Sequence, residues 1–315
     1  MRLLLALLVL AVARPWARAA DEHWCYEIQK KTEPNCLGPK EWKWDCQKKR
    51  QSPINIIASN AEVKKDLGLF SFSSYEKKKK WNVTNNGHTV LIDLNKEAKI
   101  EGGGLNTEYQ ATQLHFHWSR NLTGGSEHSI NGEHTAMEMH IVHQKKQLTS
   151  KSQRASENTS EDIAVLAFLV KVGSQNDNFQ PLVDILPTIS KPNTSTAMNE
   201  PVSLFDLIPE KEKLKDYFRY LGSLTTPECS ETVVWTVFQE PIYLGKDQVL
   251  PFSEKLFYDK SRKKNMTDNV RPPMQSLEGR SVYKSYSSAA PERLLPLALT
   301  TLLVPALAYL TAGSL

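Results

Sequence analysis

The chain lacks two features that mark common functional classes: a strong net charge and closely spaced cysteine pairs. Its 315 residues include 39 Lys and Arg against 35 Asp and Glu. The expected mature span, 20–287, leaves out four of the basic residues and one acidic residue, so 35 basic and 34 acidic residues remain. This balance gives no basis for binding nucleic acid or anionic lipid, and the one basic block, Lys77 to Lys80, is typical of a solvated loop.

The longest hydrophobic runs stand at the two ends of the chain rather than in its middle. Residues 1–19 combine Arg2, an apolar run from Leu3 to Val12, and the small-residue site Ala17-Arg18-Ala19. This order is the pattern of a secretory signal peptide, which is removed from the mature protein. We therefore expect the mature chain to begin near residue 20.

Residues 288–315 are expected to be a GPI-attachment propeptide that is also removed. Leu294 to Leu315 is uncharged and mostly apolar but has no basic residue after it, whereas a stop-transfer helix usually carries Lys or Arg on its cytosolic side. Small residues and a short polar spacer precede this tail. The preferred attachment residue is Ser287, with Ser285 and Ser288 as alternatives. A retained single-pass anchor is the alternative to the lipid.

The four cysteines predict two disulfides, because a chain with a signal peptide folds in an oxidising compartment. No C-x-x-C spacing is present, which argues against a cysteine-based metal site. Three pairings are open. One of them joins Cys25 to Cys36 and leaves Cys46 with Cys229, a long closure that would constrain the unfolded chain most. Five N-x-S/T motifs are glycan acceptor sequences: Asn82, Asn121, Asn158, Asn193 and Asn265.

Short β-type runs separated by glycine turns indicate one β-dominated domain. Between Leu69 and Ile141 such runs alternate with turns such as Asn131-Gly132, the pattern of an antiparallel meander. The continuous apolar run Ile163 to Val170 predicts a strand buried on both faces in the middle of a large sheet. Another strand is expected from Glu231 to Phe238. Short helices are expected at three places: Phe179 to Leu186, Val202 to Leu207 and Pro251 to Tyr258.

The strongest chemical signal lies in Gln113-Leu114-His115-Phe116-His117-Trp118 and Glu138-Met139-His140. Alternate residues of a strand face the same side, so His115 and His117 share a face, and a neighbouring strand could add His140. Three converging imidazoles form a metal site, most naturally for zinc. Gln113 and Glu138 each stand two residues before a histidine, where an oxygen could accept the proton of its other ring nitrogen. The alternative is ordinary histidines, because this spacing also arises by chance.

Longer motifs, from about His23 to Pro272, resemble the α-class carbonic anhydrases. These motifs are Gln51-Ser52-Pro53-Ile54-Asn55-Ile56, Asn86-Gly87-His88, the two histidine stretches above, Gly125-Ser126-Glu127-His128, Gly132-Glu133-His134-Thr135 and Tyr220-Leu221-Gly222-Ser223-Leu224-Thr225-Thr226-Pro227. The ends and cysteines are similar to those of the GPI-anchored members. The resemblance implies a single α+β domain within 20–287, with a short C-terminal stem, built on a twisted, mainly antiparallel sheet of about ten strands with peripheral helices.

The resemblance also implies roles for individual residues. The matched zinc ligands are His115, His117 and His140. The oxygens that hold their other ring nitrogens belong to Gln113, Glu138 and the backbone of Asn269.

Other matched positions concern the reaction itself. Thr225 matches the hydroxyl that orients the attacking oxygen, and Glu133 is the carboxylate that accepts from Thr225. Thr226 lies beside the substrate, and His88 matches a proton shuttle. Tyr26 and Asn85 fall among the groups that order water in the site.

Five positions match an apolar wall that receives carbon dioxide, although ordinary core packing is the alternative for each: Val142, Val165, Leu224, Val233 and Trp235. The expected function is zinc-dependent, reversible hydration of carbon dioxide to bicarbonate and a proton by a GPI-anchored lyase at the extracellular face of the plasma membrane. The resemblance implies Zn2+ as cofactor and bicarbonate transporters as neighbours. The alternative is a catalytically weak, carbonic-anhydrase-like surface binding module.

Overall fold

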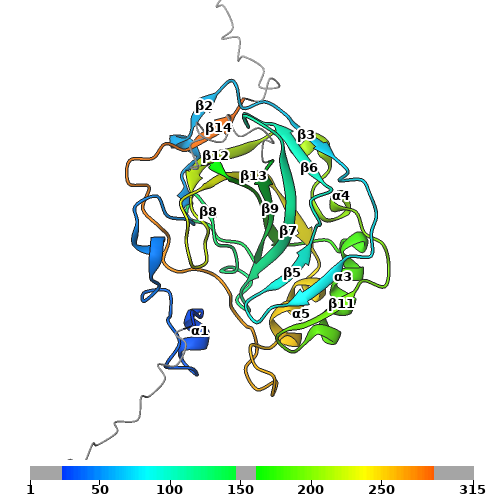
Figure 1. The fold of residues 1–315 in the computed structure, drawn as a ribbon. Coiled ribbons are helices and arrows are strands. Elements are labelled where there is room, and N and C mark those ends of the chain that lie inside the picture. The colour runs from blue at the N-terminus through cyan, green and yellow to red at the C-terminus, as the bar shows by residue number, and fades with distance from the viewer. Residues whose placement is uncertain (1–22, 147–160, 287–315) are drawn as a thin grey trace, which may run out of the picture.

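One large twisted sheet organises the residues that the computed structural model describes, 23–146 and 161–286 (Figure 1). Its strands are β2 (Glu62–Lys64), β3 (Phe70–Ser73), β4 (Asn82–Asn85), β5 (Val90–Asp93), β6 (Lys99–Gly102), β7 (Tyr109–Trp118), β9 (Met137–Lys145), β10 (Ile163–Val172), β11 (Thr194–Ala197), β12 (Tyr217–Gly222), β13 (Val233–Leu244) and β14 (Tyr283–Ser285). A separate parallel pair joins β1 (Asn55–Ile56) to β8 (Ser129–Ile130).

The strands follow one another in the order β11-β4-β5-β7-β9-β10-β13-β12-β14-β2, and β6 pairs with both β3 and β7. Within this sheet β10 with β13 and β14 with β2 are parallel pairs, and the other pairs are antiparallel. The predicted fold class, a mainly antiparallel sheet of about ten strands with short helices, is confirmed.

The middle of the sheet is formed by β7, β9, β10 and β13. The apolar run that predicted a central strand is β10, which lies between antiparallel β9 and parallel β13. Its residues from Ala164 to Val170 are all buried, because both faces of the sheet are covered at this point. The prediction of a doubly buried strand is therefore confirmed.

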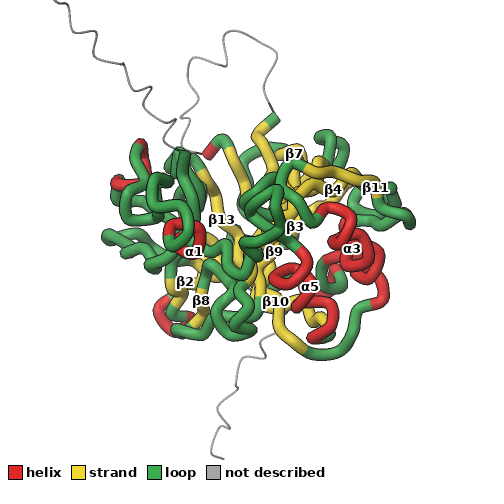
Figure 2. The backbone as a smooth tube through the Cα atoms, turned by 90° about the horizontal axis from the view of Figure 1, so that it is seen from below, coloured by secondary structure: helices red, strands yellow, loops and turns green. Residues whose placement is uncertain are grey.

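The helices are short and lie outside the sheet: α1 (Glu27–Lys30), α3 (Gln180–Ile185), α4 (Leu204–Leu207) and α5 (Lys246–Lys255). Figure 2 shows α3 and α5 together on one side of the molecule and α1 on the other. The helices expected at 179–186 and 202–207 are present, but the expected start of the last helix at Pro251 is wrong. That helix starts after Gly245, and Pro251 lies inside it.

Several sequence predictions fall outside the described residues. They are the signal peptide 1–19, the propeptide 288–315 with the attachment residue Ser287, and the glycan acceptor Asn158. The other four acceptor residues, Asn82, Asn121, Asn193 and Asn265, are exposed. Within the described parts of the chain, no helix has both the length and the hydrophobicity needed to cross a lipid bilayer.

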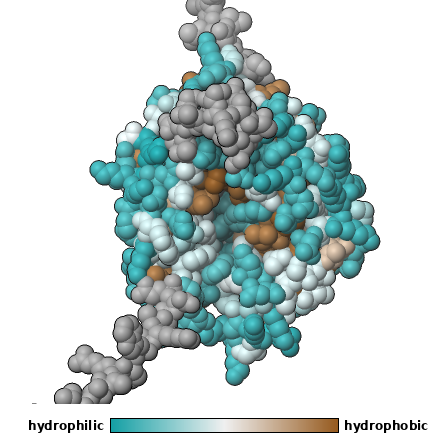
Figure 3. Space-filling view, viewed as in Figure 1, coloured by the Kyte–Doolittle hydropathy of each residue, from teal (hydrophilic) through white to brown (hydrophobic). Residues whose placement is uncertain are grey.

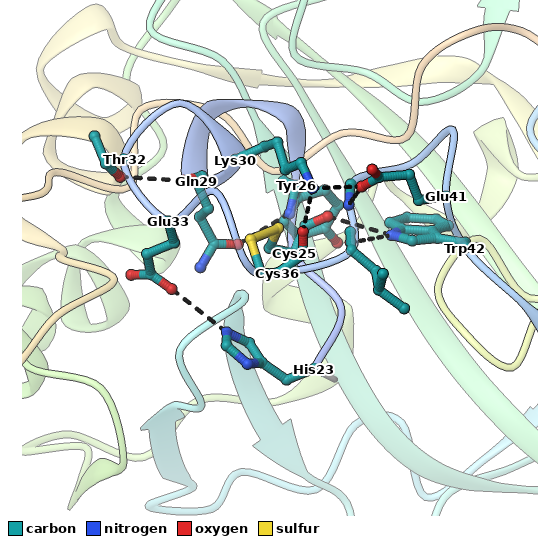
Figure 4. Close-up of a disulfide and its surroundings, with 12 residues drawn as sticks. His23, Cys25, Tyr26, Gln29, Lys30, Thr32, Glu33, Cys36, Glu41 and Trp42 are labelled. Carbon is teal, nitrogen blue, oxygen red and sulfur yellow. Dashed lines mark hydrogen bonds and ion pairs between the residues drawn. A yellow bond between two sulfur atoms is a disulfide. The ribbon is translucent and has the colours of Figure 1, made fainter. Parts of the chain in front are cut away.

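Two disulfides fix the segment before the sheet. Cys25 pairs with Cys36, and Figure 4 shows this bond among the side chains of the N-terminal segment. Cys46 pairs with Cys229, 183 residues later. Cys46 and Cys229 pack with Trp42 and Tyr26 in a small apolar cluster of their own. Of the three pairings that the sequence left open, the structure selects the one that joins Cys25 to Cys36 and Cys46 to Cys229.

The two disulfides should differ in how much they stabilise the fold. Loop-closure entropy predicts a loss of about 5 kcal/mol in the free energy of unfolding for Cys46→Ala with Cys229→Ala, and about 3 kcal/mol for Cys25→Ala with Cys36→Ala. Denaturant unfolding of the two double variants measures this difference. An equal or larger loss from the Cys25 and Cys36 pair would contradict it.

Candidate metal centre

Three histidine side chains converge where β7 and β9 lie side by side. In the register of these strands His115 stands opposite His140, and His117 is two residues further along β7. Nε2 of His115 lies 3.1 Å from Nε2 of His117 and 3.2 Å from Nδ1 of His140. Tetrahedral zinc with bonds of about 2.0–2.1 Å separates two nitrogen ligands by roughly 3.3 Å. The structure therefore brings the predicted triad together at a spacing that suits one metal ion.

The two histidines of β7 are each held through the ring nitrogen that faces away from this point. Nδ1 of His115 donates to Oε1 of Gln113 at 2.7 Å, and Nδ1 of His117 donates to the carbonyl of Asn269 at 2.8 Å. A neutral imidazole that donates through one nitrogen carries its lone pair on the other. Both Nε2 atoms are thus free to bind a metal.

The third histidine is held by a carboxylate that serves two rings. Nε2 of His140 donates to Oε1 of Glu138 at 2.6 Å, and Nδ1 of His128 donates to the same oxygen at 2.7 Å. Burial alone would raise the pKa of Glu138, but His128 and His140 hold that pKa well below its usual range. The carboxylate is therefore charged, and its acceptance leaves Nδ1 of His140 free to face the other two rings.

The electrostatics of the triad also suit a metal ion. Burial, together with the neighbouring imidazoles of His117 and His140, lowers the pKa of His115 well below its usual value. Burial likewise lowers the pKa of His117. Both rings are therefore neutral at physiological pH, which is the form that binds a metal. The residues present fit a divalent ion with one coordination position left for water or substrate.

The structure places Glu133 away from this centre. Glu133 is exposed, and it follows the turn at Asn131-Gly132, where both residues have positive φ. Glu127 instead lies at the centre: it is 1% exposed, and its Oε2 is 3.4 Å from Nε2 of His117. The expectation that Glu133 serves the site is therefore wrong in geometry, because its backbone carries it to the outside of a tight turn.

One of the two carboxylate oxygens of Glu127 lacks a hydrogen-bond partner among the described residues, which is unusual for a buried carboxylate. Its Oε1 accepts the backbone N–H of Arg271 at 2.9 Å, whereas Oε2 is buried and has no hydrogen-bond partner among the described residues. An unpartnered buried carboxylate oxygen is costly, so a donor at this position would stabilise it. This oxygen is therefore free to accept a hydrogen bond beside His117.

The loop of Thr225 is fixed by contacts on both sides. Nε1 of Trp235 donates to the carbonyl of Ser223 at 3.0 Å, and the N–H of Cys229 donates to the carbonyl of Thr226 at 2.8 Å. The Cys229 disulfide then ties the end of the loop to the N-terminal segment. Thr225 is buried, and Thr226 lines a cavity of about 120 Å³ with His115 and His117.

The predicted apolar wall forms a single cluster beside the triad. It contains Val142, Val165, Val233 and Trp235, and Leu224 packs against it. The ring centroid of Trp235 lies 4.9 Å from that of His140, so the wall reaches the metal position. In Figure 3 hydrophobic atoms gather near the middle of one face within a largely hydrophilic surface.

His88 lies at the same cavity and is half-buried. Its ring stacks on Trp24 with centroids 3.9 Å apart, and burial, with His23 adding a smaller effect, lowers its pKa to about 4. Tyr26 lines the cavity as expected, but Asn85 does not. The amide of Asn85 donates to backbone carbonyls, and the neighbouring Asn86 lines the cavity.

A neutral three-histidine site beside an apolar wall and a buried carboxylate is typical of mononuclear metalloenzymes that activate water. Residues 37–286 match the family model of the eukaryotic-type carbonic anhydrases.

The chain is 57% identical to carbonic anhydrase 4 of Oryctolagus cuniculus and 53% identical to carbonic anhydrase 4 of Rattus norvegicus, in both cases over the full length of both chains. It is 37% identical to carbonic anhydrase 12 of Homo sapiens, over 75% of this chain and 67% of that protein. The chain therefore belongs to the eukaryotic-type carbonic anhydrase family and is a carbonate dehydratase.

His117→Ala should release the metal, because the site then keeps only two imidazoles. We expect the affinity for Zn2+ to fall by more than about a hundredfold. Metal analysis after dialysis against a chelator measures the loss. His134→Ala is the control, since Nδ1 of His134 contacts the carbonyl of Ser126 and this ring is outside the triad. Full retention of metal by His117→Ala would refute the ligand assignment.

Proposed function

We propose that His115, His117 and His140 hold a zinc ion with which the protein reversibly hydrates carbon dioxide at the extracellular cell surface. The observation that carries the proposal is that all three rings are held through one nitrogen and converge through the other. When bound, zinc supplies an open coordination position and lowers the pKa of a water ligand, which makes a nucleophile available at neutral pH.

The protein's own groups would orient that nucleophile. Glu127, rather than Glu133, is our candidate for the acceptor of the Thr225 proton, because Oε2 of Glu127 is buried beside His117 and lacks a donor. An ionised carboxylate can only accept, so Thr225 would be forced to donate to it and to accept from the reacting water. This fixes the direction in which the lone pair of that water points.

The apolar wall would receive carbon dioxide, which is small and nonpolar. Val142, Val233 and Trp235 exclude water from one side of the metal position without offering hydrogen bonds. The substrate carbon can then approach the oriented oxygen without competition from ordered water.

A catalytically weak surface binding module remains the alternative function. A binding module needs neither three converging histidines nor a buried carboxylate that can accept a hydrogen bond, whereas this chain has both. The alternative would be favoured if purified protein with one zinc per chain failed to accelerate hydration.

The roles of the two glutamates can be separated by a matched pair of variants. Glu127→Gln should lower the hydration rate by roughly a hundredfold, since it removes the obligate acceptor, and Glu133→Gln should leave the rate within about twofold. Adding Thr225→Val to Glu127→Gln should cause little further loss, because the two residues act as a unit. Stopped-flow hydration at equal zinc content measures these rates. A full-rate Glu127→Gln variant would exclude this acceptor.

His88 is our candidate for the group that carries the product proton out to buffer. Trp24 covers one face of the half-buried ring, and this loss of water lowers the pKa of His88 to about 4, so the ring must turn toward water before it can take a proton at neutral pH. Nδ1 of His88 has no partner among the described residues, so no hydrogen bond at that atom opposes the rotation.

His88→Ala should therefore slow turnover in dilute buffer by on the order of tenfold or more. Added imidazole should restore the rate, because it replaces the missing proton carrier. The same variant in concentrated buffer is the control and should approach the rate of the unchanged protein. An imidazole-insensitive defect would show that His88 acts in another way.

We also propose that the mature protein is secreted and carries a GPI anchor near Ser287. The proposal rests on residues 1–19 and 288–315 of the sequence. A phosphatidylinositol-specific phospholipase should release the protein from intact cells with its hydration activity retained. Activity that stays with the membrane after this treatment would favour a retained helix.

A further inference from the structure

A second cavity lies away from the metal centre, where β12 meets β13 and β14. Its volume is about 440 Å³, which is within the range of small-molecule sites. Strand β12 lies between the two places. Arg219 faces the side of this cavity, whereas the hydroxyl of Tyr220, the next residue, contacts His128 beside the triad, although Tyr220 also contributes to the lining of the cavity. The proposed hydration reaction makes no use of this cavity.

Arg219 is the most buried charge that lines the cavity, at 6% exposure. In the sheet register it stands opposite Thr236 on β13, and its Nε and Nη2 donate to Oγ1 of Thr236 at 3.2 and 2.9 Å. The rings of Phe70 and Tyr217 lie 5.9 and 5.7 Å from its guanidinium carbon. These contacts hold the guanidinium in one orientation.

This guanidinium has no carboxylate partner within 4.0 Å among the described residues. A guanidinium has five N–H donors, and Thr236 is the one hydrogen-bond acceptor that the described residues offer it. Burial lowers the pKa of Arg219. The negative charges of Glu161 and Asp66 raise that pKa without forming an ion pair or a hydrogen bond with the guanidinium. A buried, oriented and unpaired guanidinium is costly for a fold unless an anion binds it.

The other cations around the cavity already have partners. Lys64 lies 3.6 Å from Asp66, and Arg50 lies 3.6 Å from Glu231. Arg280 donates to four backbone carbonyls: those of Leu277, Leu221, Gln51 and Ser276. Backbone carbonyls do not neutralise Arg280, so Arg219 and Arg280 both stay positive, and the Glu161 carboxylate also lines the cavity. These two positive charges and one negative charge leave a net charge of +1 for a ligand, which favours a monoanion over a dianion such as phosphate.

Besides the charged residues, which include the carboxylates of Asp66 and Glu161, the lining is largely apolar. Leu67, Leu105, Leu221, Val234 and the ring of Tyr283 contribute to it, and Asn106 and Ser281 add polar groups. A bare inorganic ion would leave most of this lining in contact with water. An organic anion with an apolar body would cover it and gain from burial.

We propose that this cavity is a binding site for a small organic monocarboxylate, whose carboxylate pairs with Arg219 and whose apolar body covers the Leu105, Leu221 and Val234 wall. Thr236 and the two aromatic rings preorganise the guanidinium, so little side-chain entropy is lost on binding. The site is separate from the metal centre and requires neither zinc nor turnover.

Benzoate is a suitable probe, and backbone amide shifts of the zinc-loaded, ¹⁵N-labelled protein report where it binds. We expect saturable shifts at Gly104, Leu105 and Asn106, which line the cavity. Shifts confined to His117 and Thr226 would mean binding at the metal centre alone, and the absence of saturation would mean no site; either result overturns the proposal. Phosphate that binds as tightly as benzoate would overturn the assignment of a monocarboxylate.

A matched pair of variants then tests the charge. Arg219→Met should weaken benzoate binding by about tenfold or more, because it removes the charge-assisted pair and keeps a side chain of similar length. Lys64→Met removes a lining cation that is already paired and should change the affinity by less than about twofold. Equal losses in the two variants would show nonspecific attraction and overturn the proposal. The shift map of the unchanged protein stands even if Arg219→Met does not fold.

Discussion

The buried carboxylate of Glu138 is the constraint on which the metal centre depends. It is fully buried, its Oε1 accepts from His140 and His128, and its Oε2 accepts the backbone N–H of His128 at 2.7 Å. His128 in turn contacts the hydroxyl of Tyr220 on β12 at 2.6 Å. One charge thus links β9, the loop before it and β12. A buried carboxylate is tolerated when donors serve both of its oxygens. The loss of one donor would therefore destabilise the fold.

The register between β7 and β9 is the second requirement, because it decides which side chains share a face. His115 stands opposite His140, and His117 stands opposite Glu138. A shift by one residue would turn all the β9 side chains to the other face and separate the triad. The apolar residues between the histidines, Phe116 and Met139, are fully buried on the opposite face. Core packing therefore fixes the register that the metal site needs.

Periodicity in the sequence was sufficient to predict the central strand and the shared face of two triad histidines, whereas it left the addition of His140 as one of two interpretations. The face shared by His115 and His117 follows from strand geometry alone, and β10 follows from an unbroken apolar run. The acceptor carboxylate could not be found in this way, since two Glu-His pairs lie between His117 and His140, at Glu127 and Glu133. Which of the two glutamates points toward the metal centre depends on a tertiary contact, not on the local sequence.

A Cβ on Gly125 would lie 1.8 Å from the carbonyl of Ala136, so this backbone packs against its neighbour just before Glu127. A sequence rule also fails at the start of α5. Proline is typical of the first turn of a helix, whereas Pro251 lies inside α5, which accommodates its missing N–H.

The N-terminal segment connects the two disulfides to the cavity at the metal centre. This segment is too short and irregular to form a core, so it depends on the Cys25–Cys36 and Cys46–Cys229 bonds. Those bonds place Trp24 against His88 at the mouth of the cavity. The pKa of His88 is low there because the half-buried ring has lost part of its contact with water, and a ring that turned into water would regain a value near neutral. If His88 carries the product proton as proposed, release of that proton to buffer depends on how firmly a disulfide-bonded segment holds one indole in place.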